Sequence, residues 1–340
     1  MLKHHFIFSL LLIVIVSCKT NNEPPDPQIP VFNTLMRTTG DTTDVVAATS
    51  SGTCLMGGST DVDEAFRWMI TKSGGGDFVI LRSDVSYGYN PYIRKLGTIN
   101  SVETIVIRTD SDAINPLVSH KIRNAEALFI AGGDQADYVK LWKDTPVEDA
   151  INYLINTKHV PVGGTSAGCA IMGSSYFAAF KGSVTSAEAM RNPYNSLVSL
   201  GHDDFISNPF LQNTITDQHY SQRGREGRSV TFMARMDKDL AINPRGIAVD
   251  EETAVCIDKN GIANVFGTNK VFFLQFTSSS PEVCLAGTAL TWNNNTQAIK
   301  VYRIAGLAIG NGSFDLKDYS TANGGTWLYY YVDNGVFYSH

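Results

Sequence analysis

Short apolar runs alternate with helix-like stretches between about residue 50 and residue 175. This alternation is typical of a parallel sheet whose strands are joined by crossover helices. The runs predict five strands, at 54–56, 78–81, 104–107, 128–131 and 160–163. From about residue 245 onward, polar and apolar positions alternate between turns, which predicts a mainly β structure for residues 266–340.

One helix and one hairpin have clear local signals. Thr145 suits an N-cap, Pro146 the first helical position and Glu148 the end of a capping box, with apolar residues at 147, 151 and 154 on one face. A helix between the strands at 128–131 and 160–163 is a crossover, so those strands should be parallel. Near the end of the chain, Asn334-Gly335 between two aromatic runs predicts a β-hairpin.

The first residues have the pattern of an export signal. Lys3 precedes an apolar run over residues 6–16, which is too short to span a bilayer. The ending Ile15-Val16-Ser17-Cys18 resembles the lipobox of bacterial lipoproteins, so we expect Cys18 to be lipidated; a plain signal peptide is the alternative. The expected organisation is a signal peptide at 1–17, a proline-rich tether at 18–31, an α/β hydrolytic domain at 32–265 and a β-rich extension at 266–340.

Charge and cysteine content narrow the functional classes. The formal net charge is −6 and there is no basic run, which argues against nucleic acid as a partner. Beyond Cys18, the four cysteines fit no metal motif, so no metal site is expected. Buried free thiols are the favoured interpretation, and Cys256 with Cys284 is the one pair considered for a disulfide.

A candidate nucleophile lies in Gly164-Thr165-Ser166-Ala167-Gly168, which fits the G-x-S-x-G pattern. In that pattern a sharp turn between a strand and a helix holds the serine hydroxyl out of the sheet edge. The predicted strand at 160–163 precedes the motif and a small-then-apolar helical start follows it. Serine needs a base, and His219 is the best of the seven histidines because it lies at the expected carboxyl end of a strand and precedes three arginines.

At this point the sequence resembles the cyanophycinase family of serine peptidases, relatives of the bacterial aspartyl dipeptidases. The motifs that carry the resemblance occur in order: a GGDQ loop at 132–135, the GTSAG elbow at 164–168, DQHY at 217–220 with arginines after it, and GIAVDEETA at 246–254. The resemblance implies a flavodoxin-like α/β sandwich, similar to class I glutamine amidotransferases, with a mainly parallel sheet. It also implies catalysis without a cofactor.

The resemblance also implies residue roles. Ser166 would be the nucleophile, His219 the general base and Glu188 the triad acid, with Asp203 or Asp204 as substitutes because the spacing of 22 residues from Ser166 to Glu188 is long. The backbone N–H groups of Gly133 and Ala167 are the expected oxyanion donors. The positions that would hold substrate are Gln135, Asp217, Gln218, Arg223, Arg225 and Arg228.

Guanidinium groups bind carboxylates well, and we expect the three arginines to lie on one helix that begins at His219. The expected reaction is hydrolysis of a peptide or isopeptide bond next to aspartate. Its type substrate in the family is cyanophycin, a polyaspartate with arginine on each side chain. An α-aspartyl dipeptidase and a non-catalytic binding lipoprotein are the alternatives. The expected location is outside the cytoplasm, on a membrane through the lipid anchor, and the sequence leaves a homodimer open.

Overall fold

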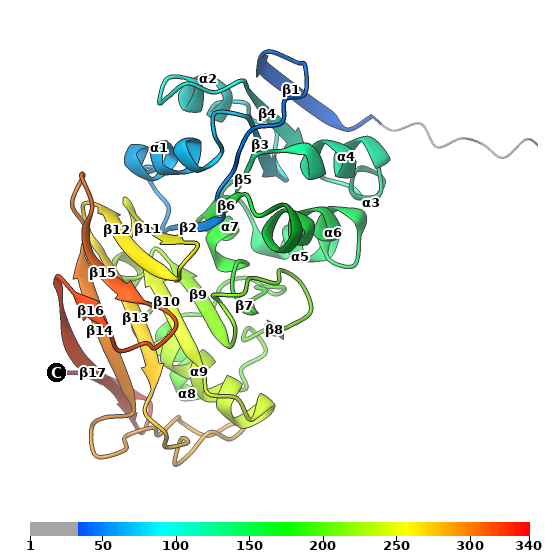
Figure 1. Cartoon of the computed structure of the whole chain (residues 1–340). Helices are drawn as coiled ribbons and strands as arrows, with labels where there is room; N and C mark the ends of the chain where they lie inside the picture. Colours follow the sequence, from blue (N-terminus) through cyan, green and yellow to red (C-terminus); the bar gives the residue numbers. More distant parts are fainter. Residues whose placement is uncertain (1–32) are drawn as a thin grey trace, which may run out of the picture. The chain divides into compact units, whose positions relative to one another are not determined.

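Two β-sheets organise residues 33–340, the part of the chain that this computed structural model describes (Figure 1). The predicted signal peptide, Cys18 and the tether lie outside the described residues. Within residues 33–340 no helix combines the length and the apolar character that a membrane crossing requires.

The first sheet has ten strands and the second has eight. In spatial order, the first sheet contains β1 (Leu35–Gly40), β4 (Ser101–Val106), β3 (Asp77–Arg82), β5 (Ala127–Ile130), β6 (Pro161–Thr165), β2 (Gly52–Met56), β11 (Thr253–Asp258), β12 (Ile262–Gly267), β15 (Asn311–Asp315) and β16 (Ala322–Asn323). The second contains β18 (Val336–Ser339), β17 (Gly325–Asp333), β14 (Ile299–Ala305), β13 (Lys270–Phe276), β10 (Arg245–Val249), β9 (Thr214–Gln218), β7 (Ser175–Phe177) and β8 (Leu200–His202).

The helical segments lie mostly in the first two thirds of the chain. They are α1 (Asp63–Lys72), α2 (Tyr89–Arg94), α3 (Asp110–Ala113), α4 (Pro116–Asn124), α5 (Gln135–Trp142), α6 (Pro146–Tyr153), the π-helix η1 (Leu154–Lys158), α7 (Ala167–Ala170), α8 (Ser186–Arg191), the 3₁₀ turn η2 (Ser221–Arg223) and α9 (Glu226–Leu240).

The predicted α/β fold with a mainly parallel centre is confirmed. Strands β4, β3, β5, β6 and β2 are parallel neighbours, and they contain the five predicted apolar runs to within a residue or two. Helix α6 begins at Pro146 with Thr145 as its N-cap, and it connects the parallel pair β5 and β6 as expected. The predicted hairpin at Asn334-Gly335 joins β17 to β18.

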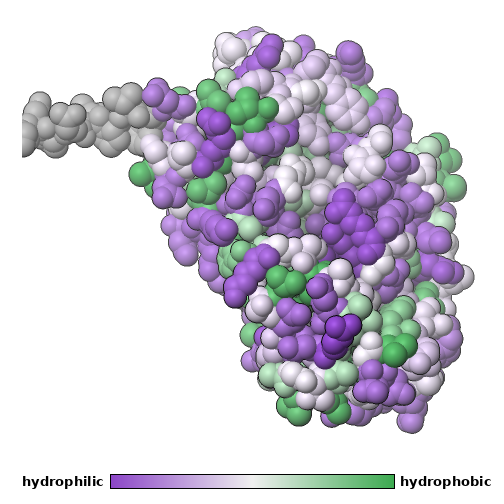
Figure 2. All heavy atoms as spheres, turned by 180° about the vertical axis from the view of Figure 1, so that it is seen from behind, coloured by the Kyte–Doolittle hydropathy of each residue, from purple (hydrophilic) through white to green (hydrophobic). Residues whose placement is uncertain are grey.

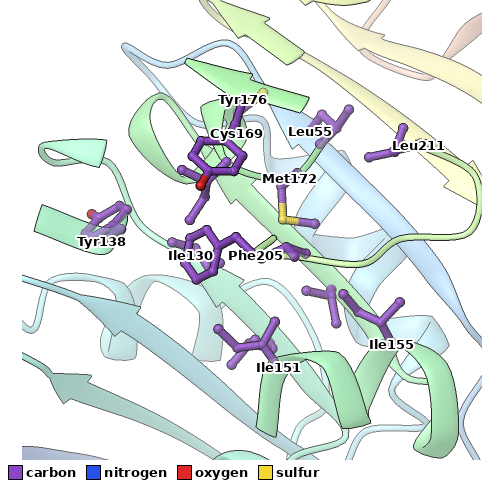
Figure 3. Packing of buried hydrophobic residues seen from close by; sticks show 14 of the residues in the cluster. Leu55, Ile130, Tyr138, Ile151, Ile155, Cys169, Met172, Tyr176, Phe205 and Leu211 are labelled. Atoms are coloured by element: carbon purple, nitrogen blue, oxygen red, sulfur yellow. The ribbon is translucent and has the colours of Figure 1, made fainter. Parts of the chain in front are cut away.

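Three apolar clusters hold the layers together. One face of the first sheet packs on α1 and α2 through residues such as Phe66 and Ile93. The other face packs partly on α4 to α6, through Trp142 and Ile151, and partly on the second sheet. Figure 3 shows this second cluster, which brings together Leu55 and Ile130 of the first sheet, Ile151 of α6 and Phe205. The far face of the second sheet is covered by α8 and α9.

The residues after 265 complete both sheets. Strands β13, β14, β17 and β18 form one side of the second sheet, whereas β15 and β16 form an edge of the first. The predicted β structure of this segment is confirmed, and every one of its strand pairings is antiparallel. Figure 2 shows one face of the molecule with its hydrophobic residues in small separate groups among hydrophilic ones.

The four cysteines of the described residues are buried and unpaired. The pairing considered for Cys256 with Cys284 is wrong, because the sulfur close to Cys256 is that of Cys54, at 3.8 Å, on the neighbouring strand β2.

Candidate active site

Ser166 occupies a strained turn between β6 and α7. Its backbone has φ 52° and ψ −115°, in a region that residues with a Cβ rarely adopt. The turn is fixed by a hydrogen bond from the Ser166 N–H to the carbonyl oxygen of Met56, at 3.1 Å. The hydroxyl is thereby held at the carboxyl edge of the parallel sheet, as the G-x-S-x-G pattern predicts.

Close backbone contacts explain the two glycines that flank the elbow. A methyl group on Gly164 would lie 2.5 Å from the backbone carbon of Gly168. One on Gly168 would lie 2.1 Å from the carbonyl oxygen of Ile130, at the end of β5. Both distances are far below van der Waals contact, so the elbow needs glycine at each position.

His219 directly follows β9 and faces the serine, as predicted. The Nε2 of His219 lies 2.8 Å from the Ser166 Oγ, and the backbone N–H of His219 donates to the carbonyl oxygen of Gly57 at 2.9 Å. A methyl group on Gly58 would lie 2.4 Å from the imidazole ring, so the loop after β2 packs directly against the base. The side chain of His219 is buried, which fixes the ring in front of Ser166.

Glu251 completes the hydrogen-bonded chain. Its Oε1 lies 2.6 Å from the Nδ1 of His219. Glu251 lies just beyond the end of β10. This strand runs parallel to β9, with Val249 opposite Gln218, so Glu251 and His219 lie at the same edge of the sheet. The backbone N–H of Glu251 donates to the Gln222 side chain at 3.0 Å, which steadies the loop.

The expected triad acid, Glu188, is wrong. Its carboxylate accepts hydrogen bonds from the N–H and hydroxyl of Thr185, in a capping box at the start of α8. The substitutes are also engaged elsewhere: Asp203 pairs with His202, and Asp204 pairs with Lys143 and Tyr176. A signal for Glu251 is present in the sequence, since it lies two residues after the apolar run at 246–249 and so near a strand's carboxyl end.

Burial sets the protonation state of the base. It lowers the pKa of His219 below the ordinary 6.5, while the hydrogen bond to Glu251 opposes that shift and the positive charge of Arg223 adds to it. The net pKa is lowered, so neutral imidazole predominates at neutral pH. With its Nδ1–H donated to Glu251, the ring presents a free Nε2 lone pair to the Ser166 hydroxyl.

The loop after β5 lies against the nucleophile. A methyl group on Gly132 would be 3.4 Å from the Ser166 Cβ, which places the GGDQ loop beside the reacting oxygen. Among residues 33–340, no acceptor is found for the N–H of Gly133 or for that of Ala167. Gln135 begins α5 on the same loop and is half-buried.

Most of the predicted substrate residues form a buried ionic network. Arg228 is only 1% exposed, and it donates to both carboxylate oxygens of Asp217, which Ser229 also contacts at 2.8 Å. Arg225 donates to the carbonyl and side-chain oxygens of Gln218. Burial would raise the pKa of Asp217, but the charge and hydrogen bonds of Arg228, the charge of Arg225 and the hydrogen bond from Ser229 together outweigh it, and the net pKa is lowered. The expectation that Arg228 presents a free guanidinium to substrate is therefore wrong.

The three arginines do not share one helix. Arg223 ends the short turn η2, Gly224 follows in a left-handed conformation with φ 56°, and Arg225 is the N-cap of α9. This break turns Arg223 outward, with 52% of its side chain exposed and its Nε 3.9 Å from the Glu251 carboxylate. Of the three, Arg223 is the one that faces solvent beside the triad.

Replacing Arg228 with glutamine should destabilise the protein by about 3–5 kcal/mol, because Asp217 would remain buried without its partner. Urea unfolding measures the loss. The double variant D217N/R228Q should lose less than the sum of the single variants, since it buries no unpaired charge. A stable R228Q protein with additive losses would contradict the structural role of the pair.

Comparisons with known proteins match the region that holds this site. The model of peptidase family S51 matches residues 85–265, just over half of the chain, and this range includes Ser166, His219 and Glu251. The cyanophycinase of Nostoc sp. (strain PCC 7120) is 28% identical over 176 residues, 52% of this chain and 54% of that protein. The cyanophycinase of Geminocystis herdmanii (strain PCC 6308) is 30% identical over 150 residues, 44% and 49% of the two chains.

The chain thus spans about half the length of the curated relatives it matches. Among solved structures, a peptidase from an acI-B1 Actinobacterium is similar with a TM-score of 0.49 at 16% identity, over 66% of this chain and 91% of that one.

Proposed function

The chain belongs to peptidase family S51, and from this premise we propose that it is a serine hydrolase that cuts a peptide or isopeptide bond next to aspartate. The observation that carries the proposal is the hydrogen-bonded chain from Ser166 through His219 to Glu251. Nucleophile, base and orienting acid are the three parts that acyl transfer by serine requires.

The proposed mechanism follows from the contacts. His219 Nε2 takes the hydroxyl proton while the Ser166 Oγ attacks the scissile carbonyl, and Glu251 stabilises the imidazolium that forms. The N–H groups of Gly133 and Ala167 then donate to the oxyanion. His219 returns its proton to the leaving amine, which departs and leaves an acyl-enzyme. Water, activated by the same histidine, releases the acid product and restores Ser166.

For the substrate we propose a cyanophycin-like polymer, cut to β-Asp-Arg dipeptides. The matched relatives carry the name cyanophycinase, and the half-exposed guanidinium of Arg223 beside the triad suits a carboxylate of the substrate. Arg225 is positioned less freely, because Gln218 holds its guanidinium, and burial lowers its pKa to about 10, which still leaves it charged at neutral pH.

The direct test is to incubate the protein separately with cyanophycin and with α- and β-aspartyl dipeptides, and to identify the products by mass spectrometry. The proposal predicts soluble β-Asp-Arg from the polymer. Cleavage of α-aspartyl dipeptides alone would instead assign an α-aspartyl dipeptidase. Absence of cleavage in all three reactions would contradict the proposed activity.

The lowered pKa of His219 predicts the acid limb of the pH profile. Since only the neutral imidazole can accept the serine proton, kcat/KM should fall as the pH drops through the pKa of His219, with its midpoint below about 6.5. Replacing Arg223 with glutamine removes a positive charge that opposes protonation, so the midpoint should move to higher pH. An unchanged midpoint would contradict this electrostatic coupling.

We also propose that the protein is exported and anchored through Cys18, on the basis of the lipobox-like sequence. Replacing Cys18 with serine should move the protein from the membrane fraction to the soluble fraction or leave the precursor uncleaved, because the thioether needs that sulfur. Equal membrane retention of both proteins would argue against lipidation.

A further inference from the structure

A row of side chains crosses one face of the second sheet, far along the strands from the triad. In the strand register Arg245 lies opposite Gln275, Gln275 opposite Lys300, and Lys300 opposite Tyr329. Tyr329 in turn exchanges backbone hydrogen bonds with His340. Directly opposed residues point to the same face of a sheet. These five residues, here called the cross-strand row, therefore lie side by side over four strands and the residue that follows β18.

The first half of the row is positively charged. A pocket of about 470 Å³ is lined by Arg245, Gln275 and Lys300 together with neutral residues, and no carboxylate lines it. Within residues 33–340, neither Arg245 nor Lys300 has an acidic side chain within ion-pair distance of it. Both are half-buried, so their charges are only partly screened by water. In a chain with a net charge of −6, this pocket is a local concentration of positive charge.

The second half of the row is aromatic, since the rings of Tyr329 and His340 stack with their centres 5.9 Å apart, and further aromatic rings lie beside it. The Nζ of Lys300 lies 4.0 Å from the ring centre of Trp327, which is 38% exposed. Tyr331 stacks on Tyr338 with ring centres 4.9 Å apart, and Tyr338 is 43% exposed. The opposite face of strand β17 is different, since Tyr330 and Val332 are buried in the cluster that includes α9. Strand alternation therefore places Trp327, Tyr329 and Tyr331 on the opposite face of β17 from these two residues, although Tyr331 also packs against that cluster.

We propose that the cross-strand row, with the rings of Tyr331 and Tyr338 beside it, is a docking surface for an extended peptide polymer that carries both carboxylate and guanidinium groups. This inference rests on the proposed function and adds a second contact for the same substrate. Carboxylates bind at Arg245 and Lys300 by charge-assisted hydrogen bonds, and guanidinium groups stack on the tyrosine rings. A ligand of one charge sign would match only half of the surface.

The position of the row suits a polymer rather than a small substrate. Arg245 begins β10, and Glu251 at the triad lies six residues further on, just past the end of the same strand, so the pocket and the site are separated by roughly 20 Å. A dipeptide cannot reach both places, whereas a polymer chain can. Binding at the row raises the local concentration of scissile bonds near Ser166.

The test compares binding and turnover in two matched variants. K300Q/Y329S removes a charge and a ring from the row, and K238Q removes the same charge from an exposed position on α9, which covers the opposite face. In an S166A background, sedimentation with insoluble cyanophycin should show roughly 10-fold or greater weakening for K300Q/Y329S and none for K238Q. With Ser166 intact, kcat/KM on the polymer should fall to a similar extent, while kcat/KM on a β-aspartyl dipeptide should not change.

Unchanged polymer binding by K300Q/Y329S would overturn the proposal, as would an equal loss in K238Q. Tight binding of S166A to an acidic polysaccharide, with weak binding to cyanophycin, would overturn it in favour of a different ligand class. A wild-type protein that binds cyanophycin through the row but hydrolyses neither polymer nor dipeptide would contradict the proposed activity and still support the docking surface.

Discussion

Replacing Ser166 with alanine should lower kcat by about 10⁴- to 10⁶-fold while leaving the fold intact, because members of such a triad act as a unit. The hydroxyl that accepts the acyl group is lost, and what remains is the weak catalysis provided by the oxyanion donors and binding. Product release from the polymer, followed together with the circular dichroism spectrum, measures both effects.

Cys169 provides the matched control for this experiment. It is another nucleophilic side chain on the same elbow, yet it is fully buried, and burial raises the pKa of its thiol well above the ordinary value. Its replacement with alanine should leave most activity in place. An inactive C169A protein beside an active S166A protein would show that the nucleophile is assigned wrongly.

Replacing Glu251 with glutamine should lower kcat by about 10⁴-fold, the cost of removing the orienting carboxylate from a serine triad. The amide keeps the shape of the side chain but can donate a hydrogen bond to Nδ1, which favours the tautomer whose Nε2 carries the proton. It also cannot stabilise the imidazolium. KM should change little, since Glu251 contacts the base rather than the substrate.

Glu188 is the control that separates this assignment from the one suggested by the sequence motif. E188Q should keep its activity and lose only about 0.5–2 kcal/mol of stability at most, as expected for a weakened helix cap. A large loss of kcat in E188Q together with an active E251Q protein would contradict the geometry described for the acid.

The local elements could be predicted from the sequence because their signals are local. The apolar runs identified the parallel strands, Thr145 and Pro146 marked the start of α6, and Asn334-Gly335 marked the last hairpin. The placement of Ser166 and His219 beside each other could also be predicted, since each follows a strand whose carboxyl end is recognisable. Each of these predictions needed only a few neighbouring residues.

The triad acid needed spatial information that the chain order does not contain. Glu188 had a suitable neighbouring sequence, but Thr185 provides a local partner that satisfies its carboxylate. Glu251 lies 32 residues beyond His219, and the two meet only because β9 and β10 pair in parallel. The pairing of strands decides which carboxylate reaches the base.

The expectation that Arg223, Arg225 and Arg228 share one substrate-binding helix is wrong for a similar reason. The arginines that follow His219 in the sequence suggest a ligand-binding face. Asp217, however, is buried at the end of β9, and Arg228 is buried with it as its ion-pair partner. The strands after residue 265 can be predicted from the sequence. Their division between the two sheets cannot, because it depends on long-range strand pairing.

The central claim is that Ser166 is an activated nucleophile, and covalent labelling tests it most directly. Treatment of the wild-type protein with a fluorophosphonate probe, followed by peptide mass spectrometry, should give one adduct, on Ser166. S166A should remain unlabelled, and E251Q should label far more slowly. A wild-type protein that cleaves its substrate but carries no adduct on Ser166, or carries it on another residue, would contradict the account.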